Sequence, residues 1–154
     1  MRIEYLADHQ ALVTELARLH FSEWGYLRPD EALEDRTHRL RGSCGRSAIQ
    51  TVLVALAGSK LCGSAMLLAH DMGTRSDLTP WLAGVYVVPE CRHRGHGSAL
   101  VGCAVSEAAA LGVPKLYLYT PDAAEFYSRL GWSALDHCEY LGKRVVVMSR
   151  QTVA

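Results

Sequence analysis

The residues from Arg92 to Ser98 have the types and spacing of a binding site for a phosphate group. Gly95 and Gly97 carry no side chain, so the backbone beside them can approach a ligand closely. An apolar helical pattern follows, and the free N–H groups at the start of a helix attract negative charge together with the helix dipole. Arg92 and Arg94 add positive side chains. We therefore expect this segment to bind a phosphate.

The residues before this segment predict a buried strand. Residues 85–88 read Val-Tyr-Val-Val, and β-branched and aromatic residues are typical of strands. Pro89 cannot extend a strand ladder, so the connection to the following helix is short. Two familiar phosphate loops do not fit the segment. A P-loop needs a Lys after its last glycine, and the dinucleotide fingerprint needs a third glycine where Leu100 stands.

The pattern that remains is R/Q-x-x-G-x-G, which Arg92, Gly95 and Gly97 satisfy after a V-x-V-x-P-E strand end. In this form and place the segment resembles the pyrophosphate loop of the GNAT superfamily of acyl-CoA-dependent N-acetyltransferases. The resemblance implies acetyl-CoA as the co-substrate and a pantetheine arm that lies along the strand like an additional strand. The cofactor contacts that it implies are Val85, Tyr86, Val87, Val88, Arg92, His93, Arg94, Gly95, His96, Gly97, Ser98 and Phe126.

A second segment, residues 126–132, resembles the F-Y-x-x-L-G-F/W element that follows this loop in the superfamily. Phe126 and Leu130 can share one helical face, while Tyr127 is rotated from Phe126 by about 100°. The resemblance places Tyr127 beside the thioester sulfur, where its hydroxyl would donate to the departing thiolate. An unperturbed phenol has a pKa near 10 and an unperturbed thiol one of roughly 8.5, so partial donation is expected. The amide of Val87 or a neighbour would stabilise the oxyanion.

The amine-binding side departs from the family's pattern. Several members carry a Glu near the positions of Ala83 and Gly84, where this chain has no carboxylate, and Thr120 replaces the family's strand-end Asn. The resemblance assigns the acceptor site to residues 23–26, 70–81 and 137–141. The candidates for the base are Glu23, His70 and Asp71, and the expected acceptor contacts are Glu23, Trp24, Asp71 and Trp81.

The predicted function is transfer of an acetyl group from acetyl-CoA to a primary amine, by direct attack on the thioester. Carboxylates in the acceptor segments suit a cationic small-molecule amine, whereas Arg39 and Arg75 suit an acidic peptide N-terminus, so both acceptors stay open. The alternative is a non-catalytic acyl-CoA sensor, which the missing carboxylate near Gly84 favours. A homodimer is compatible with the resemblance.

Composition limits the other classes of function. The 154 residues fit a single domain, residues 1–154, and contain 16 basic and 16 acidic residues, which disfavours binding to nucleic acid or an anionic membrane. No apolar run reaches the roughly 18 residues of a membrane span, and the N-terminus has no signal-peptide core. We therefore expect a cytoplasmic protein. The 5 cysteines and 7 histidines show no CxxC or HxxxH spacing, so neither a disulfide framework nor a metal site is predicted.

The hydrophobic pattern predicts the order β-α-α-β-β-β-α-β-α-β-β, which is also the order of the GNAT fold. We expect an α/β (mixed α+β) fold with a mostly antiparallel, twisted sheet of about seven strands and helices on both faces. Asp8 is expected to cap the first helix and Pro29 to open the second. The expected strands are residues 2–6, 49–57, 61–70, 85–88, 115–119, 132–138 and 144–148, and the later helices are residues 98–111 and 122–130.

Overall fold

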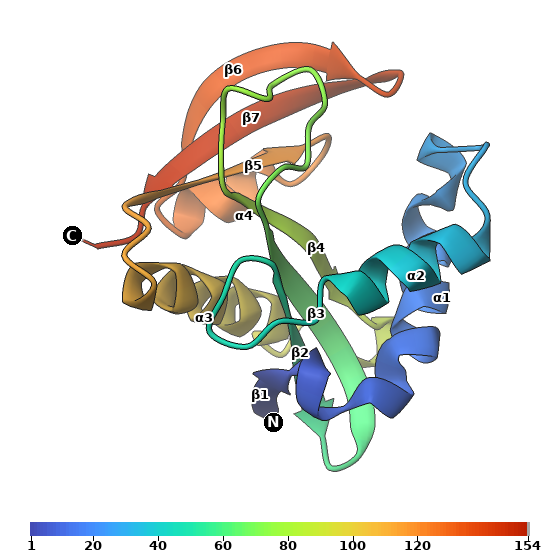
Figure 1. Cartoon of the computed structure of the whole chain (residues 1–154). Helices are drawn as coiled ribbons and strands as arrows, with labels where there is room; N and C mark the ends of the chain where they lie inside the picture. Colours follow the sequence, from blue (N-terminus) through green and yellow to red (C-terminus); the bar gives the residue numbers. More distant parts are fainter. Residues whose placement is uncertain (154) are drawn as a thin grey trace.

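A seven-stranded sheet forms the centre of the computed structural model, which describes residues 1–153 (Figure 1). Its order is β1-β2-β3-β4-β5-β7-β6, and all neighbours are antiparallel except β4 and β5. The strands are β1 (Arg2–Tyr5), β2 (Thr51–Ala57), β3 (Lys60–Leu68), β4 (Trp81–Val87), β5 (Lys115–Thr120), β6 (Ser133–Tyr140) and β7 (Lys143–Gln151). The predicted mixed, mostly antiparallel sheet is confirmed.

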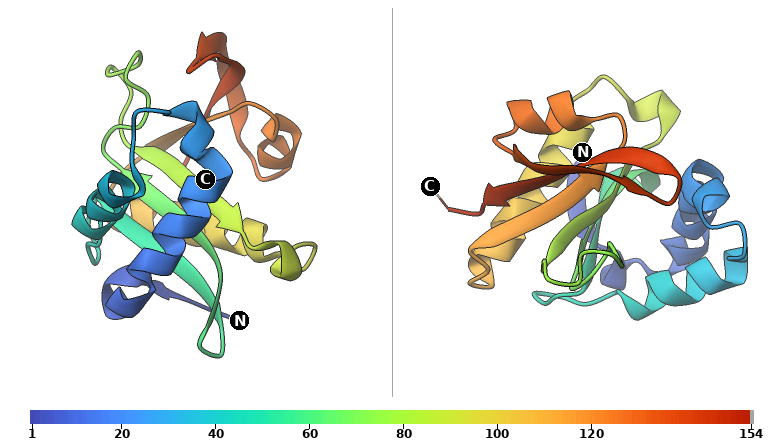
Figure 2. Two further views of the ribbon diagram at one scale, coloured as in Figure 1. Left: turned by 90° about the vertical axis from the view of Figure 1, so that its right-hand side faces the viewer. Right: turned by 90° about the horizontal axis from the view of Figure 1, so that it is seen from above.

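Helices cover both faces of the sheet, as Figure 2 shows. One face carries α1 (Val13–Trp24) and α2 (Leu33–Gly42), and the other carries α3 (His96–Ala110) and α4 (Ala124–Arg129). The alternating side chains of β2 separate two cores, because Val52 and Val54 pack toward α1 whereas Leu53 and Ala55 pack toward α3. β2 is therefore buried on both faces of the sheet, between the two pairs of helices.

The sheet is interrupted between β4 and β5. These parallel neighbours pair at a single position, Trp81 opposite Tyr117, and the strands then separate (Figure 1). The edge of β4 beyond Trp81 consequently faces no strand of β5. In a fold where buried backbone groups are almost always paired, such an edge is a place where a ligand can supply the missing partners.

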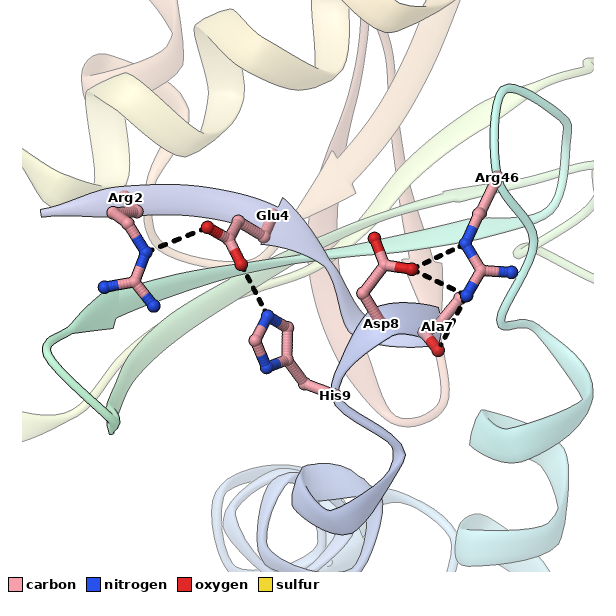
Figure 3. A network of polar contacts seen from close by, with 6 residues as sticks. All are labelled: Arg2, Glu4, Ala7, Asp8, His9 and Arg46. Atoms are coloured by element: carbon pink, nitrogen blue, oxygen red, sulfur yellow. Dashed lines mark hydrogen bonds and ion pairs between the residues drawn. The ribbon is translucent and has the colours of Figure 1, made fainter.

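The prediction that Asp8 caps the first helix is wrong. Two short 3₁₀ turns, Leu6–Asp8 and Gln10–Leu12, precede α1, whose N-cap Leu12 provides no side-chain cap. The Asp8 carboxylate instead pairs with Arg46, whose Nη2 lies 2.6 Å from Asp8 Oδ1 and also donates to the Ala7 carbonyl (Figure 3). A long-range ion pair thus replaces the expected local cap.

Several other helix boundaries differ from the expectation. The second helix begins at Leu33 rather than near Pro29, and the Asp35 carboxylate accepts a hydrogen bond of 3.0 Å from the Ala32 N–H at its start. The third begins at His96, so that Gly97 lies inside its first turn. The fourth begins only at Ala124, because residues 121–123 form a turn in which Thr120 Oγ1 accepts from the Ala123 N–H.

Within residues 1–153 no helix is both long enough and apolar enough to cross a bilayer.

Candidate active site

The loop between β4 and α3 presents a run of unpaired backbone amides. A 3₁₀ turn, Pro89–Cys91, leaves the strand, and the chain then takes positive φ angles at His93 (+64°) and Gly95 (+81°). The first bond of the helix runs from the Ala99 N–H to the Gly95 carbonyl at 3.1 Å. Within residues 1–153, the amides from His93 to Ser98 have no hydrogen-bond acceptor. Together with the dipole of a 15-residue helix, these amides provide donors that could bind an anion.

The basic side chains of this loop point in different directions. Arg92 Nε donates to the Val87 carbonyl at 2.8 Å, and its guanidinium lies 5.7 Å from the centre of the Tyr86 ring. His96 Nδ1 contacts the Met1 sulfur, whereas Arg94 is exposed. The loop's capacity for an anion therefore rests on its backbone more than on its side chains.

Gly97 lies where three elements meet. A Cβ placed on Gly97 would lie 3.5 Å from Phe126 Cζ of α4 and 3.7 Å from Val87 Cγ2 of β4. The start of α3 is therefore in contact with both motifs recognised in the sequence. A larger side chain at position 97 would either collide with these neighbours or occupy the space in front of the free amides.

Gly84 forms a bulge in β4 next to the unpaired edge. It has a φ of +57°, and the register with β3 shifts between Ser64 and Met66, so no residue of β3 pairs with Gly84 or Val85. The Gly84 carbonyl accepts a hydrogen bond of 2.7 Å from Ser64 Oγ on the β3 side. Because the Gly84–Val85 peptide is trans, the Val85 N–H points the opposite way, toward the edge that β5 leaves unpaired.

Tyr127 of α4 is 9% exposed and belongs to the core cluster against which Val85 and Val87 of β4 also pack. Its ring makes edge contacts with Phe126 and Trp132, at centroid distances of 5.1 and 6.1 Å. Burial raises the pKa of Tyr127 to about 12, and the nearby negative charge of Asp122 acts in the same direction. The hydroxyl thus stays protonated across the neutral and moderately alkaline range and can donate a hydrogen bond.

The segments expected to bind the acceptor come together on the α1–α2 side of the sheet. Tyr140, at the end of β6, accepts through its hydroxyl from the Gly73 N–H at 3.2 Å and from Arg28 Nη2 at 3.5 Å. Lys143, beyond the β6–β7 turn, lies 5.4 Å from the centre of the Tyr26 ring. The connection after α1, the loop after β3 and the β6–β7 hairpin therefore contact one another.

Asp71 is the acidic residue of this region with a strongly altered pKa. Desolvation by burial raises the pKa of Asp71 to about 6, although the positive charges of Arg28 and Arg39 oppose the shift. The charge of Asp71 in turn helps raise the pKa of Tyr119, a residue of β5 whose ring contacts Tyr140 at 5.1 Å. A carboxyl group with this pKa is ionised at pH 7 and can accept a proton.

The other residues considered for the acceptor side differ in their surroundings. Glu23 and His70 are exposed, and within residues 1–153 their side chains have no hydrogen-bond or ion-pair partner. Trp24 is half-buried and packs on His20 at 5.1 Å and on Tyr86 at 6.0 Å. Trp81 is 0% exposed and donates from its indole N–H to the Leu78 carbonyl at 2.8 Å. Its ring belongs to the core, so it has no surface with which to contact an acceptor.

Sequence reasoning did not identify two polar residues that the fold brings together here, His20 and Ser64, whereas Tyr140 lies within the expected acceptor segment 137–141. His20 and Ser64 are far apart in the chain and meet only because α1 packs over β3. One local signal was available, since an isolated glycine in a strand such as Gly84 often marks a bulge. Within the described residues, no group of three or more His, Cys, Asp or Glu side chains could hold a metal ion.

Comparisons with known proteins agree with this geometry. Residues 48–134 match the family model of the GNAT acetyltransferase domain. No curated protein matches the sequence. Among solved structures, an aminoglycoside 6'-N-acetyltransferase complexed with coenzyme A shares 16% identity, with a TM-score of 0.80 over 100% of this chain and 98% of that one. An aminoglycoside 6'-acetyltransferase type Ii shares 19% identity, with a TM-score of 0.78 over 100% and 99% of the two chains. The aminoglycoside 6'-N-acetyltransferase from Enterococcus faecium shares 16% identity, with a TM-score of 0.78 over 100% and 98%.

Proposed function

The chain belongs to the GNAT acetyltransferase family, and from this premise we propose that it transfers the acetyl group of acetyl-CoA to a primary amine. The acceptor is a small-molecule amine or a peptide N-terminus. The observation that carries the proposal is the run of unpaired amides from His93 to Ser98, which ends beside the unpaired edge of β4. These two features supply what a diphosphate and an amide-containing arm require, namely N–H donors and a free strand edge.

The residues present fit the coenzyme. The free amides at the start of α3 would bind the diphosphate, and Gly97 leaves the space in front of them open. The backbone of Val85 and Val87 would bind the pantetheine arm as a neighbouring strand does. Phe126, which contacts the Gly97 position, would lie beside that arm. Acetyl-CoA supplies the activated acyl group. The proton transfers and the stabilisation of the developing charge must come from residues of this chain.

Three groups of the chain would divide the work of the transfer. Asp71, or a water molecule bound to it, accepts the proton that the amine must lose to become a nucleophile. The Val85 N–H stabilises the negative charge that develops on the carbonyl oxygen during attack. The Tyr127 hydroxyl donates its proton to the sulfur as the carbon–sulfur bond breaks. The attacking nitrogen loses its second proton as the amide forms, and this proton, carried by water, replaces the one that Tyr127 gave to the sulfur.

The charges of the acceptor region support an acceptor that carries polar or charged groups. Arg28 and Arg39 lie close enough to Asp71 to influence its pKa, so both signs of charge are available there. An amine with several polar groups suits this mixture, and the similarity in fold to enzymes named for aminoglycosides supports testing such amines first. The raised pKa of Asp71 also bears on the sensor alternative, since a carboxylate from the loop after β3 could replace the one missing near Gly84.

The test is a binding measurement followed by a screen for product. Calorimetry with acetyl-CoA should show saturable binding, and mass spectrometry should show an acetyl adduct on at least one member of a panel of aminoglycosides, polyamines and short peptides. Binding without any product across the panel would favour the sensor function. The absence of binding to acetyl-CoA would refute both functions.

A further inference from the structure

A buried chain of hydrogen bonds connects α1 to the bulge of β4. His20 Nε2 lies 2.8 Å from Ser64 Oγ, and Ser64 Oγ lies 2.7 Å from the Gly84 carbonyl oxygen. The carbonyl can only accept, so the Ser64 hydroxyl donates to it. Ser64 must then accept from His20, which assigns the ring proton of His20 to Nε2. These hydrogen bonds thus join α1, β3 and β4, and each donor in them points from α1 toward β4.

The surroundings of His20 keep it in this neutral form. His20 is 3% exposed, and the rings of Trp24 and Tyr86 pack on it at 5.1 and 6.3 Å. Burial lowers the pKa of His20 to about 3, and the positive charge of Arg36 acts in the same direction. At the pH of any ordinary assay His20 therefore acts as a fixed donor that takes up no proton.

At the bulge, this chain of hydrogen bonds supplies a partner for a backbone group of β4 that the sheet leaves unpaired. Because the register skips Gly84 and Val85, the Gly84 carbonyl has lost its ladder partner in β3, and the Ser64 hydroxyl takes that place. A serine hydroxyl alone can rotate toward other acceptors, whereas a second bond from His20 fixes its direction. The imidazole also lies against the bulge, since His20 Cε1 is 3.5 Å from where a Cβ on Gly84 would be.

We propose that His20 and Ser64 are positioning residues that hold the Gly84–Val85 peptide so that the Val85 N–H faces the acetyl carbonyl. The inference rests on the proposed function and deepens it. In a trans peptide the carbonyl and the following N–H point in opposite directions, so fixing the Gly84 carbonyl toward β3 directs the Val85 N–H into the gap between β4 and β5. Neither side chain touches the reacting atoms, and both act through the backbone.

The expected effect follows from the role of an oxyanion donor. Deleting such a donor lowers kcat by about 10²–10³-fold, so tilting it should cost less, about 10- to 100-fold. The loss should appear in kcat and leave the KM for acetyl-CoA nearly unchanged, because the donor matters most once charge develops on the oxygen. The carbonyl stretch of bound acetyl-CoA should move toward its value in solution, since a weaker hydrogen bond polarises the C=O bond less.

The experiment uses the full chain and three substitutions. Ser64→Ala removes the hydroxyl, His20→Phe keeps a ring without a donor, and His20→Gln restores a neutral N–H donor at a similar reach. Steady-state kinetics, the affinity for coenzyme A and the infrared spectrum of bound carbonyl-labelled acetyl-CoA are measured for each. We expect Ser64→Ala and His20→Phe to lower kcat and shift the carbonyl band, and His20→Gln to recover part of both losses.

A matched control separates positioning from simple loss of stability. Thr51 is 0% exposed, as Ser64 is, and its hydroxyl donates to the Gly45 carbonyl at 2.7 Å, in a part of the sheet away from the bulge. Thr51→Val removes an equivalent buried bond and should lower the melting temperature as Ser64→Ala does, with kcat and the carbonyl band unchanged. If either Ser64→Ala or His20→Phe fails to fold, kcat and the infrared band of the other variant test the positioning role.

The possible results separate this inference from the function on which it rests. If folded Ser64→Ala had the kcat of the wild type and its carbonyl band did not shift, the positioning role would be overturned. The transferase function would not be affected by that result. A bell-shaped pH profile whose acidic limb disappears in His20→Gln would also overturn it, since His20 would then be titrating. No acetyl-CoA binding by the wild-type chain would refute both.

Discussion

The region proposed to bind the coenzyme (the coenzyme side) and the region proposed to bind the amine (the acceptor side) offer different kinds of chemical group to a ligand. On the coenzyme side, the groups available to a ligand belong to the backbone, from the free edge of β4 through the amides of residues 93–98. On the acceptor side they are side chains that already contact one another, as Tyr140 contacts Arg28 and Gly73. One side offers unpaired donors of fixed geometry, whereas the other offers charges whose balance depends on neighbours.

This difference explains where the family resemblance lies. The family match covers residues 48–134, which include all of β2 to β5, α3, α4 and the loop after β3 that carries Asp71, but neither α1 nor β7. A site made of backbone needs only glycines and strand breakers at fixed spacing, and such a pattern is visible in a single sequence. A site made of side chains from α1, the loop after β3 and β6 leaves no common pattern, so its ligand must be identified by chemistry.

The two sides also differ in how far their charges are neutralised by ion pairs within the fold. Glu31 on the acceptor side pairs with Arg36 at 3.1 Å and with Arg39 at 2.9 Å, so part of the positive charge there is neutralised within the fold. Among the described residues, Arg94 on the coenzyme side has no ion-pair partner. A diphosphate bound at the proposed site would therefore meet the uncompensated charge of Arg94, whereas an acceptor at its proposed site would meet both signs of charge.

Gly97→Val should produce the largest loss of coenzyme binding, and this loss should be confined to the coenzyme side. The Cβ would fit at 3.5 Å from Phe126, but the two methyl groups would displace that ring or fill the space in front of the free amides. We expect acetyl-CoA affinity to fall by about 10²-fold or more, since the amide contacts of an anion site would be lost together. Calorimetry measures it, and Gly102→Val is the control, because nothing lies within 4 Å of that glycine's Cβ position in the same helix. Equal affinities would show that the diphosphate binds elsewhere.

Tyr127→Phe should separate binding from turnover on the coenzyme side. The ring contacts with Phe126 and Trp132 remain, while the donor to the leaving sulfur is lost. We expect kcat to fall by about 10²–10⁴-fold, the range for a general acid or base, with acetyl-CoA affinity near that of the wild type. Rapid-mixing and steady-state kinetics test this. Unchanged kcat would assign Tyr127 to packing alone.

The local structure of the coenzyme side was largely predictable from sequence for the same reason. The strand, the glycines and the following helix are local in the chain, so their spacing indicates a loop that leads into a helix, and the helix begins at His96. That the amides of residues 93–98 bind a diphosphate stays a prediction. The element order and the mixed sheet followed from hydrophobic periodicity. The cap of the first helix was not predictable in this way. Asp8 has the residue type of a helix cap, but its partner Arg46 is distant in sequence, and nothing local indicates that pair (Figure 3).

The acceptor side was only partly predictable, because its properties arise from long-range packing. Asp71 was one candidate base beside Glu23 and His70, and only the folded chain shows that burial raises the pKa of Asp71. Trp81 has the residue type of a ligand-binding aromatic, yet it is 0% exposed. The His20–Ser64 pair had no sequence signal at all, since a lone buried histidine is equally compatible with a structural role.

Asp71→Asn should affect the acceptor side and leave coenzyme affinity unchanged. Because burial raises the pKa of Asp71 to about 6, the carboxyl is protonated below that pH and cannot accept a proton from the amine. The wild-type kcat/KM for the acceptor should therefore rise through about pH 6 as the carboxylate forms. In the variant we expect a loss of about 10²-fold at neutral pH and no such acidic limb. Glu34→Gln, a change of an exposed carboxylate on α2, is the control. An acidic limb that persists in Asp71→Asn would assign the base to another group.

Tyr140→Phe should have the smallest effect and tests whether the acceptor side depends on its internal contacts. The hydroxyl accepts from the Gly73 N–H at 3.2 Å and from Arg28 at 3.5 Å, so its removal frees the loop that carries Asp71 from the β6–β7 hairpin. One such hydrogen bond contributes about 0.5–1.5 kcal/mol, which corresponds to roughly a two- to thirteenfold rise in the acceptor's KM. The ring contact with Tyr119 at 5.1 Å is retained, so the hairpin should stay folded. Acetyl-CoA affinity should not change, because no group of the coenzyme side contacts this hydroxyl among the described residues. A change in coenzyme affinity instead would mean that the two sides are coupled through β5. The two sides would then differ in the groups that they offer but would not bind their ligands independently.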